Sequence, residues 1–190
     1  IWVNQFAERF VSEDIAWNFF PCNNEIHNQG IAFSLFDQAH VKFFEENGTT
    51  CAWSNYSPLG KPIEGLQADL DAAVENDSVA FYKADTLEDL AEQLGLDADA
   101  LVKTVDEWNE SVRAGSDAAF GKAKEYCFEV SEAPFYAARL MGGVLNTIGG
   151  IRVNREGQVT APDGTPIRGL YAAGIAASGF SGEVYGMAAP

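Results

Sequence analysis

The chain has 190 residues and a formal net charge of −16, with 47% hydrophobic and 21% charged residues. This composition is typical of a globular protein with a sizeable core and excludes a disordered chain. Nucleic acids and anionic membranes bind through positive patches, so the acidic balance argues against both as partners.

Cysteine and histidine are too sparse for a disulfide framework or a metal centre. The three cysteines, Cys22, Cys51 and Cys127, are widely spaced, and the two histidines are His27 and His40. A zinc site at Cys22 and His27 would lack a second pair of ligands, so no metal is expected.

The ends of the chain leave its location open. No apolar run approaches the ~20 residues needed to cross a bilayer. The sequence opens on IWVN, the pattern of a strand already under way, without an initiator Met or a signal-peptide pattern. We therefore expect a segment of a longer protein.

Short strands and amphipathic helices alternate along the first part of the chain. Residues 1–12 hold two alternating apolar runs, which predict two strands joined by a turn. Residues 14–29 have a helical pattern that Pro21 should kink or divide. Residues 31–38 predict a buried strand, followed by a helix that ends at Gly48.

The next elements are mostly helical. Pro62 is predicted to start a helix, and a strand is predicted over residues 79–85. Thr86, three residues before Asp89, has the spacing of a capping box. A longer helix ends at Gly115, and its apolar residues are spaced for one buried face: Leu101, Val105, Trp108 and Val112.

After residue 130 helical periodicity gives way to short β-like runs divided by glycines and by a Pro-Asp-Gly turn at 162–164. We predict an α+β domain over residues 1–145 and a β-rich segment over residues 146–190. About 45 residues rarely build an independent core, so this segment must pack on other protein.

Four stretches, in this order, resemble one family: ERFVSED, TLEDLAEQLGLDADALVKTVDEWNESVRAGSDAAFGK, APFYAARLMGGVLNTIGGIRVN and PIRGLYAAGIAASGFSGEVYG. The chain resembles the capping domain and final FAD-domain segment of fumarate-reductase-like flavoproteins, which include urocanate reductase and 3-ketosteroid dehydrogenases. The resemblance implies an α+β fold and FAD as cofactor. It also implies a partner, an N-terminal Rossmann-like domain with a GxGxxG pyrophosphate site, and this sequence contains no such motif.

The resemblance implies flavin contacts near two glycine-rich turns. A Gly-Gly pair before the strand IRVN lets the backbone approach the isoalloxazine, although a plain β-turn would have the same residues. Ile175 stands where the family usually has a Glu that binds the ribityl hydroxyls. The candidate FAD-binding residues are Thr147, Gly149, Gly150, Ala173, Gly174, Ile175 and Gly179.

The resemblance also implies hydride transfer between FAD and an activated carbon–carbon double bond. The family's GVHHTMGG stands here as GVLNTIGG, with Leu145 and Asn146 in place of the histidine pair. Its carboxylate-binding Arg is replaced by Tyr185, and only His40 or Lys42 lies near the usual capping-domain Arg. A buried dicarboxylate without cations would cost several kcal/mol, so we expect a neutral, enone-like or aromatic substrate.

The candidate catalytic residues are Tyr185, His40, Glu13 and Asn146. Tyr185 either donates to a substrate oxygen or packs beside the flavin. His40 is a candidate general acid or a structural residue, and Glu13 belongs to a proton path or is a solvated carboxylate. Asn146 either donates to substrate or completes a turn. The alternative function is a diverged, non-catalytic capping domain that serves as a binding or structural module.

Overall fold

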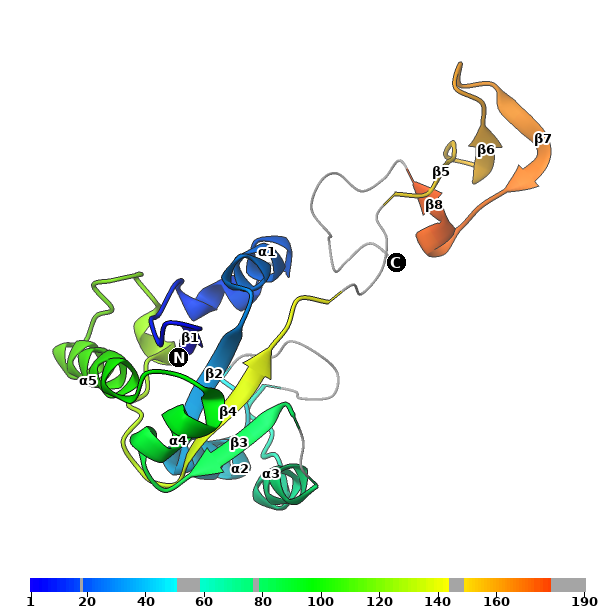
Figure 1. Ribbon diagram of the computed structural model, residues 1–190. Helices are drawn as coiled ribbons and strands as arrows, with labels where there is room; N and C mark the ends of the chain where they lie inside the picture. The colour runs from blue at the N-terminus through cyan, green and yellow to red at the C-terminus, as the bar shows by residue number, and fades with distance from the viewer. Residues whose placement is uncertain (18, 51–58, 77–78, 144–148, 179–190) are drawn as a thin grey trace. The chain divides into compact units, whose positions relative to one another are not determined.

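The computed structural model describes residues 1–17, 19–50, 59–76, 79–143 and 149–178 (Figure 1). The chain divides into two compact units, Ile1–Met141 and Gly142–Pro190. Among the described residues no helix is long and apolar enough to span a bilayer.

The first unit is built on a four-stranded sheet with the order β1-β2-β4-β3. Its strands are β1 (Trp2–Asn4), β2 (Ala32–Asp37), β4 (Phe135–Leu140) and β3 (Phe81–Ala84), and every neighbouring pair is antiparallel. The central pair runs from Ala32 opposite Leu140 to Asp37 opposite Phe135. This register brings the end of β2 beside the start of β4.

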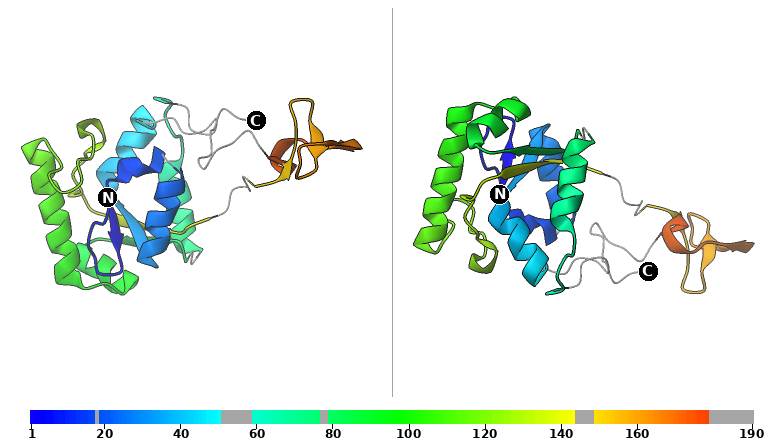
Figure 2. Two further views of the ribbon diagram at one scale, coloured as in Figure 1. Left: turned by 90° about the horizontal axis from the view of Figure 1, so that it is seen from above. Right: turned by 90° about the horizontal axis from the view of Figure 1, so that it is seen from below.

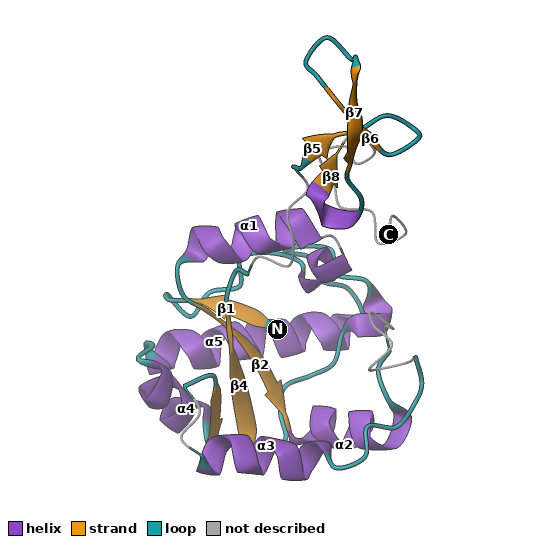
Figure 3. Ribbon diagram, turned by 90° about the vertical axis from the view of Figure 1, so that its right-hand side faces the viewer, coloured by secondary structure: helices purple, strands orange, loops and turns teal. Residues whose placement is uncertain are grey.

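Helices cover both faces of this sheet, as Figures 1 and 3 show. Along the chain they are the 3₁₀ helix η1 (Glu13–Trp17), α1 (Phe19–Gln29), α2 (Gln38–Asn47), α3 (Leu66–Glu75), α4 (Leu87–Leu94), α5 (Ala98–Ala114) and the 3₁₀ helix η2 (Lys124–Tyr126). In Figure 2, α4 and α5 (green) lie across the strands from α1 and α2 (blue to cyan). The unit is thus a layered α+β structure.

The period of two along each strand separates two cores. Phe33 and Leu35 of β2 and Ala137 of β4 pack with Leu90 of α4 and Trp108 of α5 in the larger core. The smaller core forms on the other face, where Tyr136 packs with Val41 and Leu70. Alternate strand residues therefore pack against α4 and α5 on one face and against α2 and α3 on the other.

Local sequence signals explain most helix ends. The Thr86 hydroxyl accepts the N–H of Asp89 at 3.0 Å, and Asp97 accepts the N–H of Ala100 at 2.8 Å. Gly95 and Gly115 end α4 and α5 in the left-handed conformation. α1 begins at Phe19, so Pro21 lies in its first turn, where a missing N–H costs nothing.

The start of α3 differs from the prediction at Pro62. The helix begins at Leu66, because Gly65 has a φ of 80°, which no helix residue adopts. The carboxylate of Glu45 in α2 accepts the N–H of Gln67 at 2.9 Å and so caps the helix from another element. A partner distant in sequence therefore sets this boundary.

The second unit is small and open. β5 (Ile151–Arg152) pairs in parallel with β8 (Ala177–Ser178), and β6 (Gln158–Thr160) pairs antiparallel with β7 (Pro166–Tyr171). A turn that includes Gly164 joins β6 to β7, as the Pro-Asp-Gly pattern predicts. Among its described residues the buried hydrophobic ones are Val159 and Ala177, and every residue of β7 is exposed.

Candidate functional site

The first unit contains an apolar cavity of about 690 Å³ beside β2. β1 and β2 form one wall, α1 and α2 flank it, and the segment 122–128 closes another side. Two of the predicted catalytic residues, Glu13 and His40, line this cavity. Most of the wall is aromatic or aliphatic, including Trp2, Ile26, Leu35, Phe36, Phe44, Tyr126 and Phe128.

His40 is held by a buried carboxylate at the start of α2. Asp37 has no exposed surface and is the N-cap of α2, accepting the backbone N–H of His40 at 3.1 Å. The same oxygen, Oδ1, lies 2.6 Å from Nδ1 of the His40 ring. The ring of Phe128 packs against His40 edge-on, with 5.8 Å between centroids.

The second oxygen of Asp37 fixes a segment far along the chain. Oδ2 accepts the N–H groups of Ser131 at 2.7 Å and Glu132 at 2.8 Å. Burial raises the pKa of Asp37, but the hydrogen bonds from His40 and these amides outweigh it and bring the pKa to about 2. Asp37 is therefore an anion at neutral pH, so Nδ1 of His40 carries the hydrogen between them.

Glu13 lies in a second buried charge cluster. Arg9 donates to both of its oxygens, at 3.1 Å from Nε and 3.0 Å from a terminal nitrogen, and Lys122 lies 3.2 Å away. Burial raises the pKa of Glu13, but the positive charges of Lys122 and Arg9 oppose this effect and the pKa is lowered. At neutral pH Glu13 is ionised and serves as the counter-ion of two cations.

The charges around the cavity are therefore satisfied within the protein. Lys122 is paired with Glu13, and Asp14 accepts the N–H of Ala123 at 2.8 Å. Among the described lining residues, His40 and Lys122 are the side chains that can carry positive charge. Within the part of the chain that the structure describes, the cavity thus has no unpaired Arg or Lys for a carboxylate ligand.

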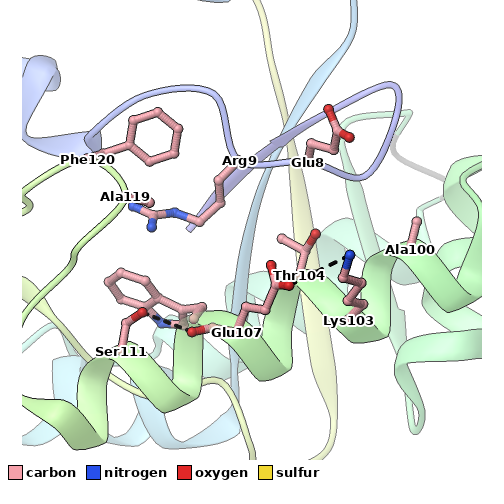
Figure 4. A pocket seen from close by; sticks show the side chains of 10 residues that line it. Glu8, Arg9, Ala100, Lys103, Thr104, Glu107, Ser111, Ala119 and Phe120 are labelled. Carbon is pink, nitrogen blue, oxygen red and sulfur yellow. Dashed lines mark hydrogen bonds and ion pairs between the residues drawn. The ribbon is translucent and has the colours of Figure 1, made fainter.

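A smaller cavity of about 330 Å³ lies between α5 and the segments around Arg9 and Phe120 (Figure 4). The Arg9 guanidinium is sandwiched there, 4.5 Å from the Trp108 ring centroid and 5.1 Å from that of Phe120. Its nitrogens are engaged by Glu13 and by Asp117, which accepts two hydrogen bonds at 3.0 Å. The Arg9 charge is therefore neutralised within the protein, and Lys103, at the exposed edge of the cavity, lies 3.7 Å from Glu107.

Predicted flavin-contacting residues of the second unit gather at one end of its parallel strand pair. Because β5 and β8 run in the same direction, Gly149 and Gly150 lie at the same end as the 3₁₀ helix η3 (Gly174–Ala176), which contains Ile175. A Cβ at Gly150 would come within 2.6 Å of the Ala176 carbonyl oxygen, whereas one at Gly149 would meet nothing within 4 Å. Close packing against Ala176 therefore requires glycine at position 150, whereas the space beside Gly149 is open.

These residues fit the approach of a flat flavin. Gly149, Gly150, Ala173, Gly174 and Ile175 are all exposed, and none carries a charged side chain. Their backbone groups would hold the cofactor, because Ile175 offers no hydrogen-bonding side chain. Ser178, a further polar group nearby, donates its hydroxyl to the Gly150 carbonyl at 2.8 Å.

Several predicted positions lie outside the described residues: Tyr185, Asn146, Thr147 and Gly179. Conversely, sequence reasoning did not single out Asp37 or Lys122. The Asp37 signal was available, because an Asp immediately before a predicted helix and three residues before His40 has N-cap spacing. Lys122 had no such signal, since its partner Glu13 is distant in sequence.

Comparisons with known proteins identify the family of the chain. The model of the FAD-binding domain family matches residues 1–188, across both units. The chain therefore belongs to the FAD-binding domain family that includes fumarate reductases and 3-ketosteroid dehydrogenases.

Among its relatives, vinyl phenol reductase of Lactiplantibacillus plantarum is 36% identical over 98% of this chain, which spans 38% of that protein. Among solved structures, 3-ketosteroid Δ1-dehydrogenase of Sterolibacterium denitrificans is 26% identical with a TM-score of 0.67, over 94% of this chain and 33% of that one. A flavocytochrome c3 fumarate reductase is 27% identical with a TM-score of 0.63, over 94% of this chain and 27% of that one. The chain thus spans about a third of these relatives.

Proposed function

We propose that the chain is the capping domain and a flavin-site segment of an FAD-dependent oxidoreductase. It acts on an activated C=C bond of a neutral, enone-like or aromatic substrate. The flavin, when bound, supplies or accepts the hydride. The observation that carries the proposal is the cavity beside β2, which combines aromatic walls with cations already paired by the protein's own carboxylates.

Electrostatics decides between neutral and dicarboxylate substrates. A carboxylate that enters an apolar cavity loses its hydration. Only cations or several hydrogen-bond donors can offset the free energy that this loss costs. Lys122 would have to leave Glu13 to serve as such a partner, which would leave Glu13 buried without it. A neutral planar substrate instead gains by packing between Phe36, Phe44 and Phe128.

The proposed roles follow from position. His40 is the proton donor from the capping side, and Glu13, itself in the cavity wall, pairs with Lys122 and Arg9. Gly149, Gly150, Ala173, Gly174 and Ile175 present backbone to the flavin, and the N-terminal Rossmann-like domain of the whole protein holds its pyrophosphate. Tyr185 and Asn146 remain candidates to donate to a substrate oxygen, and Thr147 and Gly179 remain candidates for flavin contact.

A matched pair of substrates tests the charge argument. Fumarate and its dimethyl ester share one C=C bond and differ mainly in two charges. In the full-length flavoprotein we expect kcat/KM for the diester, for a cyclic enone and for a vinyl phenol to exceed that for fumarate by about 100-fold or more. Equal rates for fumarate and its diester would contradict a neutral substrate.

The cavity itself is tested by two Phe variants. Phe128→Leu shortens an aromatic wall of the large cavity, so KM for the aromatic substrate should rise several-fold. Phe120→Leu changes the small cavity and should leave KM unchanged. If the purified full-length protein binds no flavin and reduces no alkene, the non-catalytic capping domain becomes the better function.

A further inference from the structure

We infer that Asp37 is a positioning residue that orients His40 for proton donation to the substrate. This inference rests on the proposed function, because it assumes a substrate in the cavity beside β2. Asp37 itself does not line that cavity, whereas His40 does. The pair is an Asp–His dyad whose carboxylate is wholly buried and whose ring borders the apolar space.

The geometry assigns a different task to each ring nitrogen. Nδ1 lies 2.6 Å from the Asp37 carboxylate and donates its hydrogen there. Nε2 makes no hydrogen bond to any described residue. With Nδ1 occupied, Nε2 is the nitrogen able to exchange a proton with a molecule in the cavity.

Asp37 is itself rigidly held. Its two oxygens accept three backbone N–H groups, from His40, Ser131 and Glu132, besides the ring nitrogen. Rotation of the carboxylate would break bonds to both α2 and the segment before β4. The ring is further restrained by the edge-on contact with Phe128. Such a carboxylate fixes both the tautomer and the orientation of the imidazole.

In the reduction, the Nε2 proton goes to one alkene carbon, and a bound reduced flavin would supply the hydride to the other carbon and be oxidised, so that C=C becomes CH–CH. The imidazolium thereby becomes a neutral ring, whose Nδ1 hydrogen remains hydrogen-bonded to the Asp37 carboxylate. Solvent then restores the Nε2 proton. In the dehydrogenation direction the neutral ring accepts the proton.

Nuclear magnetic resonance can determine the tautomer of His40 without any enzyme turnover. In the full-length protein with isotope-labelled histidine, the neutral His40 ring should show hydrogen on Nδ1, with the signal assigned by its loss in His40→Gln. In Asp37→Asn, the amide oxygen is needed by Ser131 and Glu132, which leaves an NH₂ group facing Nδ1. The ring should then shift its hydrogen to Nε2, whereas exposed His27 should not change. An unaltered His40 tautomer in Asp37→Asn would overturn the inference.

A double-mutant cycle separates positioning from folding. We expect His40→Gln to lower kcat about 100-fold and Asp37→Asn about 10- to 100-fold, with KM little changed. If Asp37 acts through His40, Asp37→Asn should cost nothing further in the His40→Gln background. Losses that multiply would show that Asp37 affects turnover independently of His40, and the inference would fail.

A further variant keeps the test independent of Asp37. His40→Ala retains the carboxylate and the cap of α2 and leaves room in the cavity for free imidazole. Added imidazole should restore part of kcat in this variant and have no effect on the wild type. Wild-type kcat in His40→Ala would overturn the dyad alone, whereas a wild-type protein inactive on every alkene would overturn the proposed function with it.

Discussion

At the scale of single residues, two buried anions organise the first unit. Glu13 balances Arg9 and Lys122, and Asp37 joins α2 to the segment that precedes β4. Both carboxylates lie at elements that border the large cavity, so the same groups that hold the fold also set the charge of the site. Their removal should therefore be costly.

Arg9 provides the clearest stability test. Arg9→Met would leave the buried carboxylates of Glu13 and Asp117 without their shared cation, and unpairing a buried ion pair costs about 3–5 kcal/mol. The matched control is Arg113→Met, because Arg113 has a 57% exposed side chain beside Glu129. That pair is worth about 0–1 kcal/mol. Urea unfolding measures both; equal losses would refute the importance of the cluster.

Acid should destabilise the protein through the same carboxylates. The pKa of Glu13 is lowered from 4.5 to about 2, and that of Asp37 from 3.8 to about 2. A depressed folded-state pKa gives stability that is present above the ordinary value and is lost as pH falls towards the folded one. The urea midpoint should therefore drop between about pH 5 and pH 2.

The variant Glu13→Gln isolates one contribution to that drop. It should be less stable than the wild type at neutral pH but should lose less stability on acidification. The difference between the two pH profiles removes the common effect of the other acidic groups. Parallel profiles would show that Glu13 keeps an ordinary pKa.

At the scale of elements, the ends of helices and strands are set by close backbone approaches. Gly48 ends α2 with φ 73° and ψ −171°, a region that only glycine populates well. A Cβ there would overlap the backbone of Lys61. Because α2 contains His40 and Phe44, this end of the helix also fixes part of the cavity wall.

The substitution Gly48→Ala should therefore cost clearly more than Gly95→Ala. Gly95 ends α4 in the left-handed region with no atom near its missing Cβ, so alanine there should cost about 1 kcal/mol of backbone strain. Gly48→Ala adds a steric overlap with backbone that cannot rotate away. Thermal unfolding of both variants tests this ranking, and a smaller loss for Gly48→Ala would contradict it.

Variants of the two glycines before β5 should distinguish an effect on strand packing from an effect on flavin binding. In the full-length protein, Gly150→Ala should disturb the β5–β8 pairing, because its Cβ would lie 2.6 Å from the Ala176 oxygen. Gly149→Ala has open space and should leave the melting temperature unchanged while it lowers the bound flavin content. Flavin absorbance per protein and calorimetry measure the two effects. Full flavin content in Gly149→Ala would argue against contact at this position.

At the scale of the whole molecule, the two units differ in how much hydrophobic core each one forms. The first has two cores and a sheet covered on both faces, whereas the described part of the second buries little more than Val159 and Ala177. Exposed apolar residues of the second unit include Ile167, Leu170 and Tyr171. These side chains favour burial against further protein, as a shared flavin-binding domain would provide.

We therefore expect the 190-residue chain alone to purify colourless and inactive. A full-length protein that includes the N-terminal domain should show a flavin absorption band near about 450 nm. Both proteins are incubated with FAD, the unbound cofactor is removed, and their absorption spectra are compared. A yellow, FAD-saturated 190-residue chain would contradict the need for the N-terminal domain.

The sequence by itself determined most of the elements and the family. Periodicity and caps are local, so Thr86, Gly95 and the Leu101–Trp108 stripe could be read from neighbouring residues. Only the tertiary structure decided which side chains meet. Asp37 with Ser131, Arg9 with Asp117 and Glu45 with Gln67 are separated by 94, 108 and 22 positions. Burial and ion pairing depend on such distant contacts, which pair Glu13 with Arg9 and Lys122 and join Asp37 to both His40 and Ser131.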